Sequence, residues 1–112
     1  GLAAGFVVQG DDWSFYFAGD TALYADMALI AELYRPQLAF LPIGDHFTMD
    51  PRAAALACRY LDVSRVVPIH WGTFPILRGR PADLERELRA LGLATEVVTL
   101  VPGFPWEWPA AG

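Results

Sequence analysis

Residues 13–21 read WSFYFAGDT and residues 65–73 read RVVPIHWGT, and these two stretches decide the expected fold. Each begins with a short run rich in aromatic or β-branched residues, which is typical of a buried strand. Each run ends on a potential metal ligand, Asp20 in the first and His70 in the second. Because α/β sheets bind ligands outside the carboxyl ends of their strands, we expect these two side chains to face one crevice.

Strands and helices are expected to alternate along the whole chain. Apolar residues that recur every three or four positions predict the helices, and Asp50 before Pro51 predicts an N-cap followed by a first helical residue. The order predicts an α/β fold with a mixed, mostly parallel sheet and an antiparallel hairpin at one side. We expect strands at Gly5–Gln9, Trp13–Ala18, Leu38–Leu41, Val66–Ile69 and Thr95–Val101. The first expected helix has Leu23, Met27, Ile30 and Tyr34 at helical spacing. The second runs from Pro51 to about Tyr60, and the third runs from Pro81 to a stop at Gly92.

Composition places the chain among compact domains of acidic character. With 112 residues, of which 54% are hydrophobic, the chain can bury a core of its own. The net charge of −5 gives no reason to expect nucleic acid or an anionic membrane as a partner. Cys58, the single cysteine, suits a reducing compartment, and it lies on a small-residue face typical of buried packing. We therefore expect a cytoplasmic protein.

Each candidate ligand also has a structural interpretation when it is taken alone. Asp20 stands between a strand and a helix, where aspartate is a favoured N-cap. His70 at a strand end is equally compatible with a hydrogen-bonded structural histidine. His46 lies in the connection Gly44–Met49, where exposed histidines are common. Taken one residue at a time, the sequence therefore does not decide between a structural and a metal-binding role.

Several phrases of the sequence, taken in order, resemble the C-terminal half of the metallo-β-lactamase superfamily, and most closely its branch of metal-dependent hydrolases. The set covers nearly the whole chain, which makes it far more specific than Gly-Asp-Thr alone. The matching phrases are Ala4–Val8, Tyr16–Thr21, Leu41–Gly44 with Phe47–Met49, Pro68–Phe74 and Val101–Gly103.

The resemblance implies a metal centre with Asp20 and His70 as ligands. In such a family the carboxylate bridges two metal ions or serves one, and the histidine completes the shell of the second. Zn²⁺ is the expected metal, as one or two ions, with Mn²⁺ as a substitute. The implied reaction is metal-dependent hydrolysis, in which an activated water attacks an ester, lactone, amide or phosphoester of a small molecule. His46 is assigned to the substrate side, with Thr21 and Thr73 as orienting neighbours.

The chain departs from the superfamily in one respect. The family carries a His-x-His-x-Asp-His motif in its N-terminal half, whereas this sequence has only two histidines. Asp20 and His70 leave a catalytic zinc ion at least one ligand short of the usual three. We therefore expect residues 1–112 to form a single partial domain, the second half of an αββα sandwich, inactive alone. Its partner would be the missing N-terminal half or another copy of the chain.

Two alternative functions remain at this point. The first is a non-catalytic half-domain, an assembly partner that takes up no metal and exposes a large apolar face. The second is a small phosphate-binding α/β module that uses the helix start after Gly19-Asp20-Thr21. The second is disfavoured because a carboxylate at that helix start repels phosphate unless a cation intervenes.

Overall fold

The computed structural model describes residues 6–18, 26–43, 49–69, 81–100 and 105–108. These residues form a five-stranded sheet in the order β1-β2-β3-β4-β5, in which β1 is antiparallel to β2 and every other neighbouring pair is parallel. The predicted α/β class and the antiparallel hairpin at one side are confirmed. The strands are β1 (Phe6–Gln9), β2 (Ser14–Phe17), β3 (Leu38–Pro42), β4 (Arg65–Ile69) and β5 (Glu96–Val97), and the helices are α1 (Asp26–Tyr34), α2 (Pro51–Leu61) and α3 (Pro81–Ala90).

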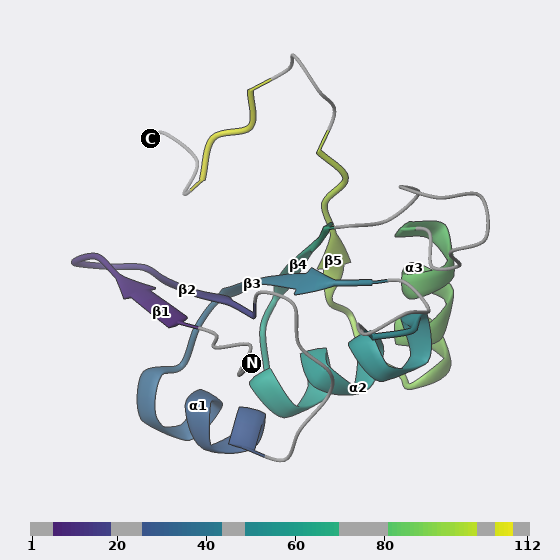
Figure 1. Cartoon of the computed structure of the whole chain (residues 1–112), viewed down its shortest axis with the longest axis horizontal. Coiled ribbons are helices and arrows are strands. Elements are labelled where there is room, and N and C mark those ends of the chain that lie inside the picture. The colour runs from purple at the N-terminus through teal and green to yellow at the C-terminus, as the bar shows by residue number, and fades with distance from the viewer. Residues whose placement is uncertain (1–5, 19–25, 44–48, 70–80, 101–104, 109–112) are drawn as a thin grey trace, which may run out of the picture.

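All three described helices cover the same face of the sheet (Figure 1). Side chains alternate between the two faces of a strand, so every second residue of β2, β3 and β4 points into the helical layer. Tyr16, Leu41 and Val66 are such residues, and all are almost completely buried. From the helical side Met27, Cys58, Leu84 and Leu88 join the same core, which confirms the predicted inward faces at these positions.

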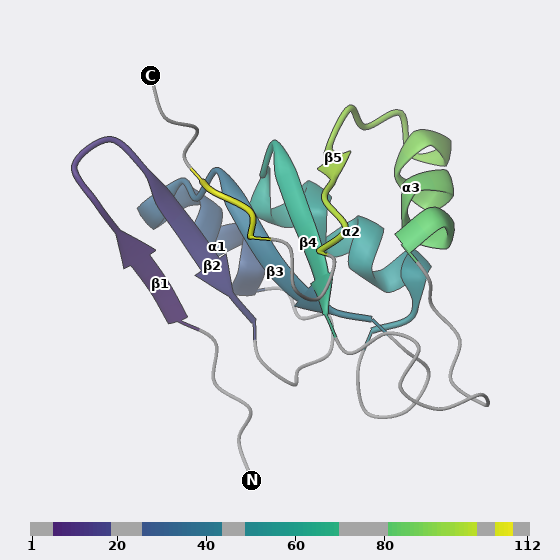
Figure 2. The same cartoon turned by 90° about the horizontal axis from the view of Figure 1, so that it is seen from above.

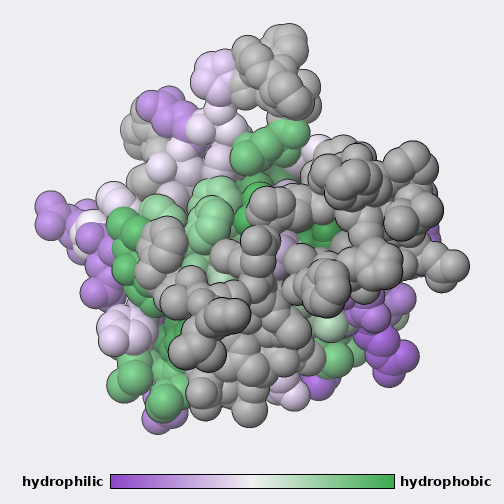
Figure 3. All heavy atoms as spheres, viewed as in Figure 1, coloured by the Kyte–Doolittle hydropathy of each residue, from purple (hydrophilic) through white to green (hydrophobic). Residues whose placement is uncertain are grey.

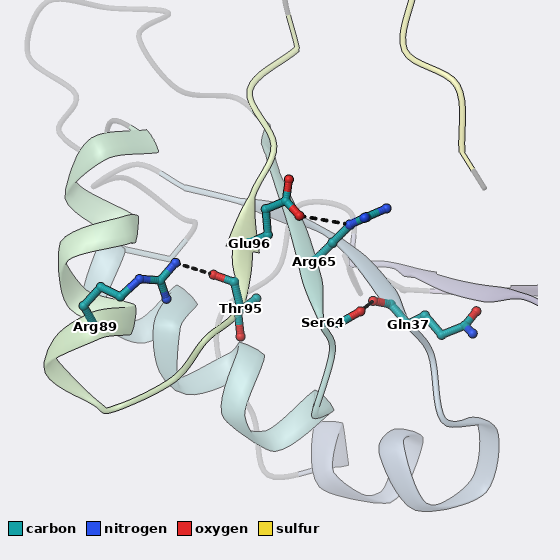
Figure 4. A network of polar contacts seen from close by, with 6 residues as sticks. All are labelled: Gln37, Ser64, Arg65, Arg89, Thr95 and Glu96. Atoms are coloured by element: carbon teal, nitrogen blue, oxygen red, sulfur yellow. Dashed lines mark hydrogen bonds and ion pairs between the residues drawn. The ribbon is translucent and has the colours of Figure 1, made fainter. Parts of the chain in front are cut away.

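Polar groups tie together the amino ends of β2, β3 and β4. The backbone carbonyl of Gln37 accepts hydrogen bonds from the Ser64 N–H and from the Ser64 hydroxyl, each at 3.1 Å. The Gln37 side-chain oxygen accepts from the Ser14 N–H at 3.1 Å. One residue therefore aligns the starts of three strands, and Figure 4 shows its contact with Ser64.

A second group of contacts aligns β5 with β4. Arg65 and Glu96 form an ion pair at 3.2 Å between neighbouring strands, and the Thr95 hydroxyl donates to the Val63 carbonyl at 3.3 Å. Arg89 of α3 donates to the Thr95 carbonyl at 2.9 Å (Figure 4). The register of the sheet is thus fixed at its amino edge, and this register decides what meets at the opposite edge.

The predicted N-cap of α2 is confirmed. Asp50 has extended backbone angles, and its carboxylate accepts a hydrogen bond from the Ala53 N–H at 2.7 Å, while Pro51 follows at the first helical position. Replacing Asp50 by Ala is expected to lower the free energy of unfolding by about 1 kcal/mol, because the Ala53 N–H loses its acceptor. Urea unfolding measures this loss, and Asp50→Asn, which keeps an acceptor, should retain most of the stability. Equal losses in both variants would contradict the cap.

The predicted helix through Met27, Ile30 and Tyr34 is confirmed as α1, which ends at Tyr34, two residues before Pro36. Met27 is buried and Ile30 packs against the core, as expected, but Tyr34 is 43% exposed. Because α1 ends at Tyr34 and Arg35 takes a positive φ of 47°, the chain turns there toward β3, away from the direction of the helix. Leu23, the fourth residue at this spacing, lies outside the described residues.

The last strand is much shorter than predicted. The sequence predicts a strand over Thr95–Val101, whereas β5 spans Glu96–Val97 and pairs with Arg65 and Val66. The Val98 N–H still donates to β4 at 2.9 Å, and residues 99 and 100 belong to no strand, while Val101 lies outside the described residues. The described residues 105–108 lie on the helix-free side of the sheet (Figures 1 and 2), so the aromatic C-terminal stretch covers the face instead of extending the edge.

Candidate metal centre

The three residues that the sequence assigns to the site, Asp20, His46 and His70, lie outside the described residues, as do Thr21 and Thr73. The structure describes the strands that lead to them. Asp20 follows β2, His46 follows β3, and His70 comes directly after β4. These three strands are parallel neighbours, so they deliver the chain to the same edge of the sheet.

The register of these strands is known up to their last residues. Phe17 of β2 pairs with Phe40 of β3, and Phe40 pairs with Val67 of β4. Neighbouring strands lie about 4.8 Å apart, so the ends of β2 and β4 are separated by about 10 Å. Two further ladder bonds continue this register to the carboxyl edge. They run from Ala18 N–H to the Phe40 carbonyl and from Ile43 N–H to the Ile69 carbonyl, both at 3.0 Å.

The connection that contains His46 starts and ends on buried anchors. Ile43 and Met49 form a parallel bridge, and both side chains are buried almost completely. Ile43 and Met49, the described residues on either side of this connection, therefore lie beside the carboxyl end of β3, and α2 starts two residues after Met49, at Pro51. The amino end of α2 carries a partial positive charge, which the Asp50 carboxylate offsets in part.

No group of three or more histidine, cysteine, aspartate or glutamate residues that could hold a metal ion occurs within the described ranges. Two carboxylates near helix starts already have partners, since Asp50 caps α2 and Asp83 pairs with Arg86 at 3.2 Å. Burial raises the pKa of the Cys58 thiol to about 12, so Cys58 stays protonated at neutral pH among the apolar residues of the core. This confirms its expected packing role.

A hollow at the opposite edge of the sheet was not expected from the sequence. It encloses about 610 Å³ between the carboxyl ends of α1 and α2, and Arg35, Gln37, Asp62 and Ser64 are among the residues that line it. Gln37 and Ser64 immediately precede β3 and β4 (Figure 4). The hollow that they line therefore lies at the amino edge of the sheet. A five-residue strand is about 16 Å long, and the hollow therefore lies far from the candidate metal centre.

A family model described as Beta-lactamase superfamily domain matches residues 1–71, more than half of the chain. The chain belongs to the beta-lactamase superfamily. A curated relative from Solibacter usitatus, named UPF0173 metal-dependent hydrolase, is 56% identical over 109 residues, which make up 96% of this chain and 46% of the relative. This confirms the resemblance that the sequence shows to the C-terminal half of a metal-dependent hydrolase of this superfamily.

Solved structures of the superfamily share the fold. Igni18, a metallo hydrolase from Ignicoccus hospitalis, superimposes with a TM-score of 0.78 at 39% identity, covering 92% of this chain and 46% of that protein. The metallo-beta-lactamase fold protein YhfI from Bacillus subtilis reaches a TM-score of 0.65 over 86% of this chain and 40% of its own, and at 16% identity it supports the fold alone. The predicted half of a metallo-β-lactamase-like fold is confirmed, and the chain spans about half the length of the proteins that it matches.

Proposed function

We propose that this chain is the C-terminal half of a metal-dependent hydrolase domain and that Asp20 and His70 bind the same metal centre. The observation that carries the proposal is the register of the sheet. Phe17, Phe40 and Val67 stand in one row across β2, β3 and β4. Counting three residues onward along each strand gives positions 20, 43 and 70. Asp20 and His70 thus follow this row by the same number of residues in the sequence, which supports the proposal that their side chains reach one centre.

The spacing of this row suits a shared metal ion. The ends of β2 and β4 are about 10 Å apart, and an Asp and a His side chain, each with a metal bond of about 2 Å, can together bridge that gap. A carboxylate and an imidazole are donors that Zn²⁺ prefers, and Mn²⁺ accepts the same pair. A bound ion would lower the pKa of a coordinated water and so supply the attacking group for hydrolysis. Asp20 and His70 would hold and orient the ion, and His46 would lie on the substrate side.

The donor set remains incomplete with these two residues alone. A catalytic zinc site uses three protein ligands, and this chain offers two by the present assignment. The relative from Solibacter usitatus is about twice as long as the stretch that it shares with this chain. We therefore propose that residues 1–112 are one partial domain, that an N-terminal half or a second copy supplies the remaining ligands, and that the chain alone is inactive.

The substrate class and the location of the protein follow by proposal as well. Substrates are small molecules with an ester, lactone, amide or phosphoester bond, because a metal-activated water attacks all four. Within the described residues no helix is long and apolar enough to cross a membrane. The buried, free thiol of Cys58 suits the reducing conditions of the cytoplasm, where we place the protein.

Calorimetric titration of the chain with Zn²⁺ and Mn²⁺ tests the shared site. The chain alone should bind these ions weakly, and Asp20→Ala and His70→Ala should each abolish the remaining uptake, because either change leaves a single ligand. His46→Ala and Asp11→Ala serve as matched controls and should bind as the unchanged chain does. If either ligand variant keeps the full uptake, the two residues do not share a site. If the unchanged chain takes up no metal even with an added N-terminal half, the assembly-partner alternative is favoured.

A further inference from the structure

The hollow at the amino edge of the sheet has an apolar floor. Leu61 and Pro36 are buried, Ala31 is half-buried, and all three line the hollow. Its volume of about 610 Å³ lies within the range of about 300–1,000 Å³ that is usual for sites of small molecules. Because each methylene group gains free energy when it leaves water, a floor of this kind favours a ligand with a short aliphatic chain.

Charged residues line the hollow from both neighbouring helices. Glu32 belongs to α1, Arg35 directly follows α1, and Asp62 directly follows α2. All three are exposed, and within the described part of the chain no ion pair joins any of them to another residue. Two carboxylates and one guanidinium leave the hollow with an excess of negative charge, which favours a cationic ligand.

The ends of α1 and α2 add partial negative charge to the same place. Arg35 and Asp62, the residues after the two helices, take left-handed φ angles of 47° and 54°, and both line the hollow. Their N–H groups donate to the carbonyls of Ala31 and Cys58 at 3.0 and 2.8 Å, so each helix stops there. The carboxyl end of a helix carries about half a negative charge, and such an end stabilises a nearby cation.

On the side of the sheet, Ser64 offers a further acceptor to the hollow. Its hydroxyl donates to the Gln37 carbonyl at 3.1 Å (Figure 4). A hydroxyl group has one hydrogen atom, so the lone pairs of the Ser64 Oγ can accept hydrogen bonds from a ligand. A primary ammonium group fits this chemistry, because it carries one positive charge and donates three hydrogen bonds.

A second apolar surface on α1 has a different character. Leu29 and Leu33 are 51% and 63% exposed, as the green surface over this helix shows (Figure 3). Both lie two positions from Ala31, which lines the hollow, and two residues turn about 200° around a helix. The two leucines therefore face away from the hollow. An aliphatic chain that adheres to them does so whatever its charge, whereas the hollow selects a cation.

We propose that the hollow is a binding site for a small organic cation, a primary alkylammonium whose chain lies on the apolar floor and whose ammonium group contacts Glu32 and Asp62. Arg35 opposes the bound cation and lowers its affinity. The site lies at the edge of the sheet opposite to the candidate metal centre, because Gln37 and Ser64 precede β3 and β4. It therefore does not depend on the proposed hydrolase function or on any metal.

Nuclear magnetic resonance titrations of the chain with butylamine, butanol and butyrate test the selection of a cation. The three probes have the same chain length and differ in charge at neutral pH. Butylamine should bind at least about tenfold more tightly than the other two, and it should shift the amide signals of Gln37, Asp62 and Ser64. Equal binding of the three probes, or tighter binding of butyrate, overturns the proposal. All samples contain a chelator, so the result is independent of the metal centre.

Variants with opposite expected effects test the position of the ammonium group. Glu32→Gln and Asp62→Asn should each weaken butylamine binding about two- to fivefold, the usual effect of one exposed charge pair, and asparagine tolerates the left-handed backbone. Arg35→Gln should tighten it by a similar factor. Glu85→Gln, at an exposed carboxylate of α3, and Leu33→Ala are the controls and should bind as the unchanged chain does. Unchanged affinity in both carboxylate variants overturns the proposal, and so does weaker binding by either control.

Discussion

Asp20→Ala and His70→Ala are each expected to lower the rate of hydrolysis by about a thousandfold or more in the completed domain. By the completed domain we mean this chain joined behind the upstream part of the Solibacter usitatus relative. A metal ion contributes several kcal/mol to transition-state stabilisation, and each 1.36 kcal/mol corresponds to about a factor of ten in rate. Losing either ligand removes most of this contribution. The rate is measured on a nitrophenyl ester, an aliphatic lactone, a nitroanilide and a nitrophenyl phosphodiester.

Two further variants sharpen this prediction. His46→Ala should change kcat/KM for the preferred substrate more than it changes metal content, because His46 is assigned to the substrate side. Asp11→Ala, in the exposed turn between β1 and β2, should have no effect on either quantity. Full activity in both Asp20→Ala and His70→Ala would show that the two residues do not hold the metal.

Leu41→Ala is expected to destabilise the chain by about 2–5 kcal/mol, because it removes a fully buried side chain from the centre of the core. Leu41 lies on β3, between the two strands that lead to Asp20 and His70. A domain of ordinary stability has about 5–15 kcal/mol in total, so the variant should be partly unfolded near physiological temperature. Urea unfolding, followed by circular dichroism, measures the loss.

Leu33→Ala is the matched control for this change. Leu33 is 63% exposed on α1, and its truncation should cost no more than about 0.5 kcal/mol. Similar losses in the two variants would contradict the assignment of Leu41 to the core. Because Leu41 stands between the two ligand strands, its variant should also weaken the metal affinity of the completed domain, whereas Leu33→Ala should not.

Local signals were sufficient to predict most elements of the fold. Asp50 and Pro51 mark the start of α2 because a cap and a fixed φ act within a few residues, and Gly92 ends the α3 region with a positive φ of 74°. The parallel order of β2, β3 and β4 follows from their alternation with helices. These features depend on short-range chemistry, which a single sequence contains in full.

Features that depend on distant contacts were not predictable in this way. Residues after Val98 have the composition of a strand, yet β5 ends early, and Trp108 packs on Trp13 and Phe15 on the other face of the sheet. The exposure of Tyr34 depends on where α1 ends and turns. No local pattern encodes either outcome. For the site, the sequence indicates the residue types, and the structure adds that the strands before Asp20 and His70 are parallel and flank β3.

The metal content of the completed domain tests whether Asp20 and His70 bind one metal centre. Purified protein is equilibrated with Zn²⁺, freed of excess ion and analysed by elemental mass spectrometry. We expect at least one zinc ion per chain, reduced by at least half in Asp20→Ala and in His70→Ala and unchanged in His46→Ala and Asp11→Ala. Full zinc content in both ligand variants would contradict a metal centre shared by the row that joins β2 and β4.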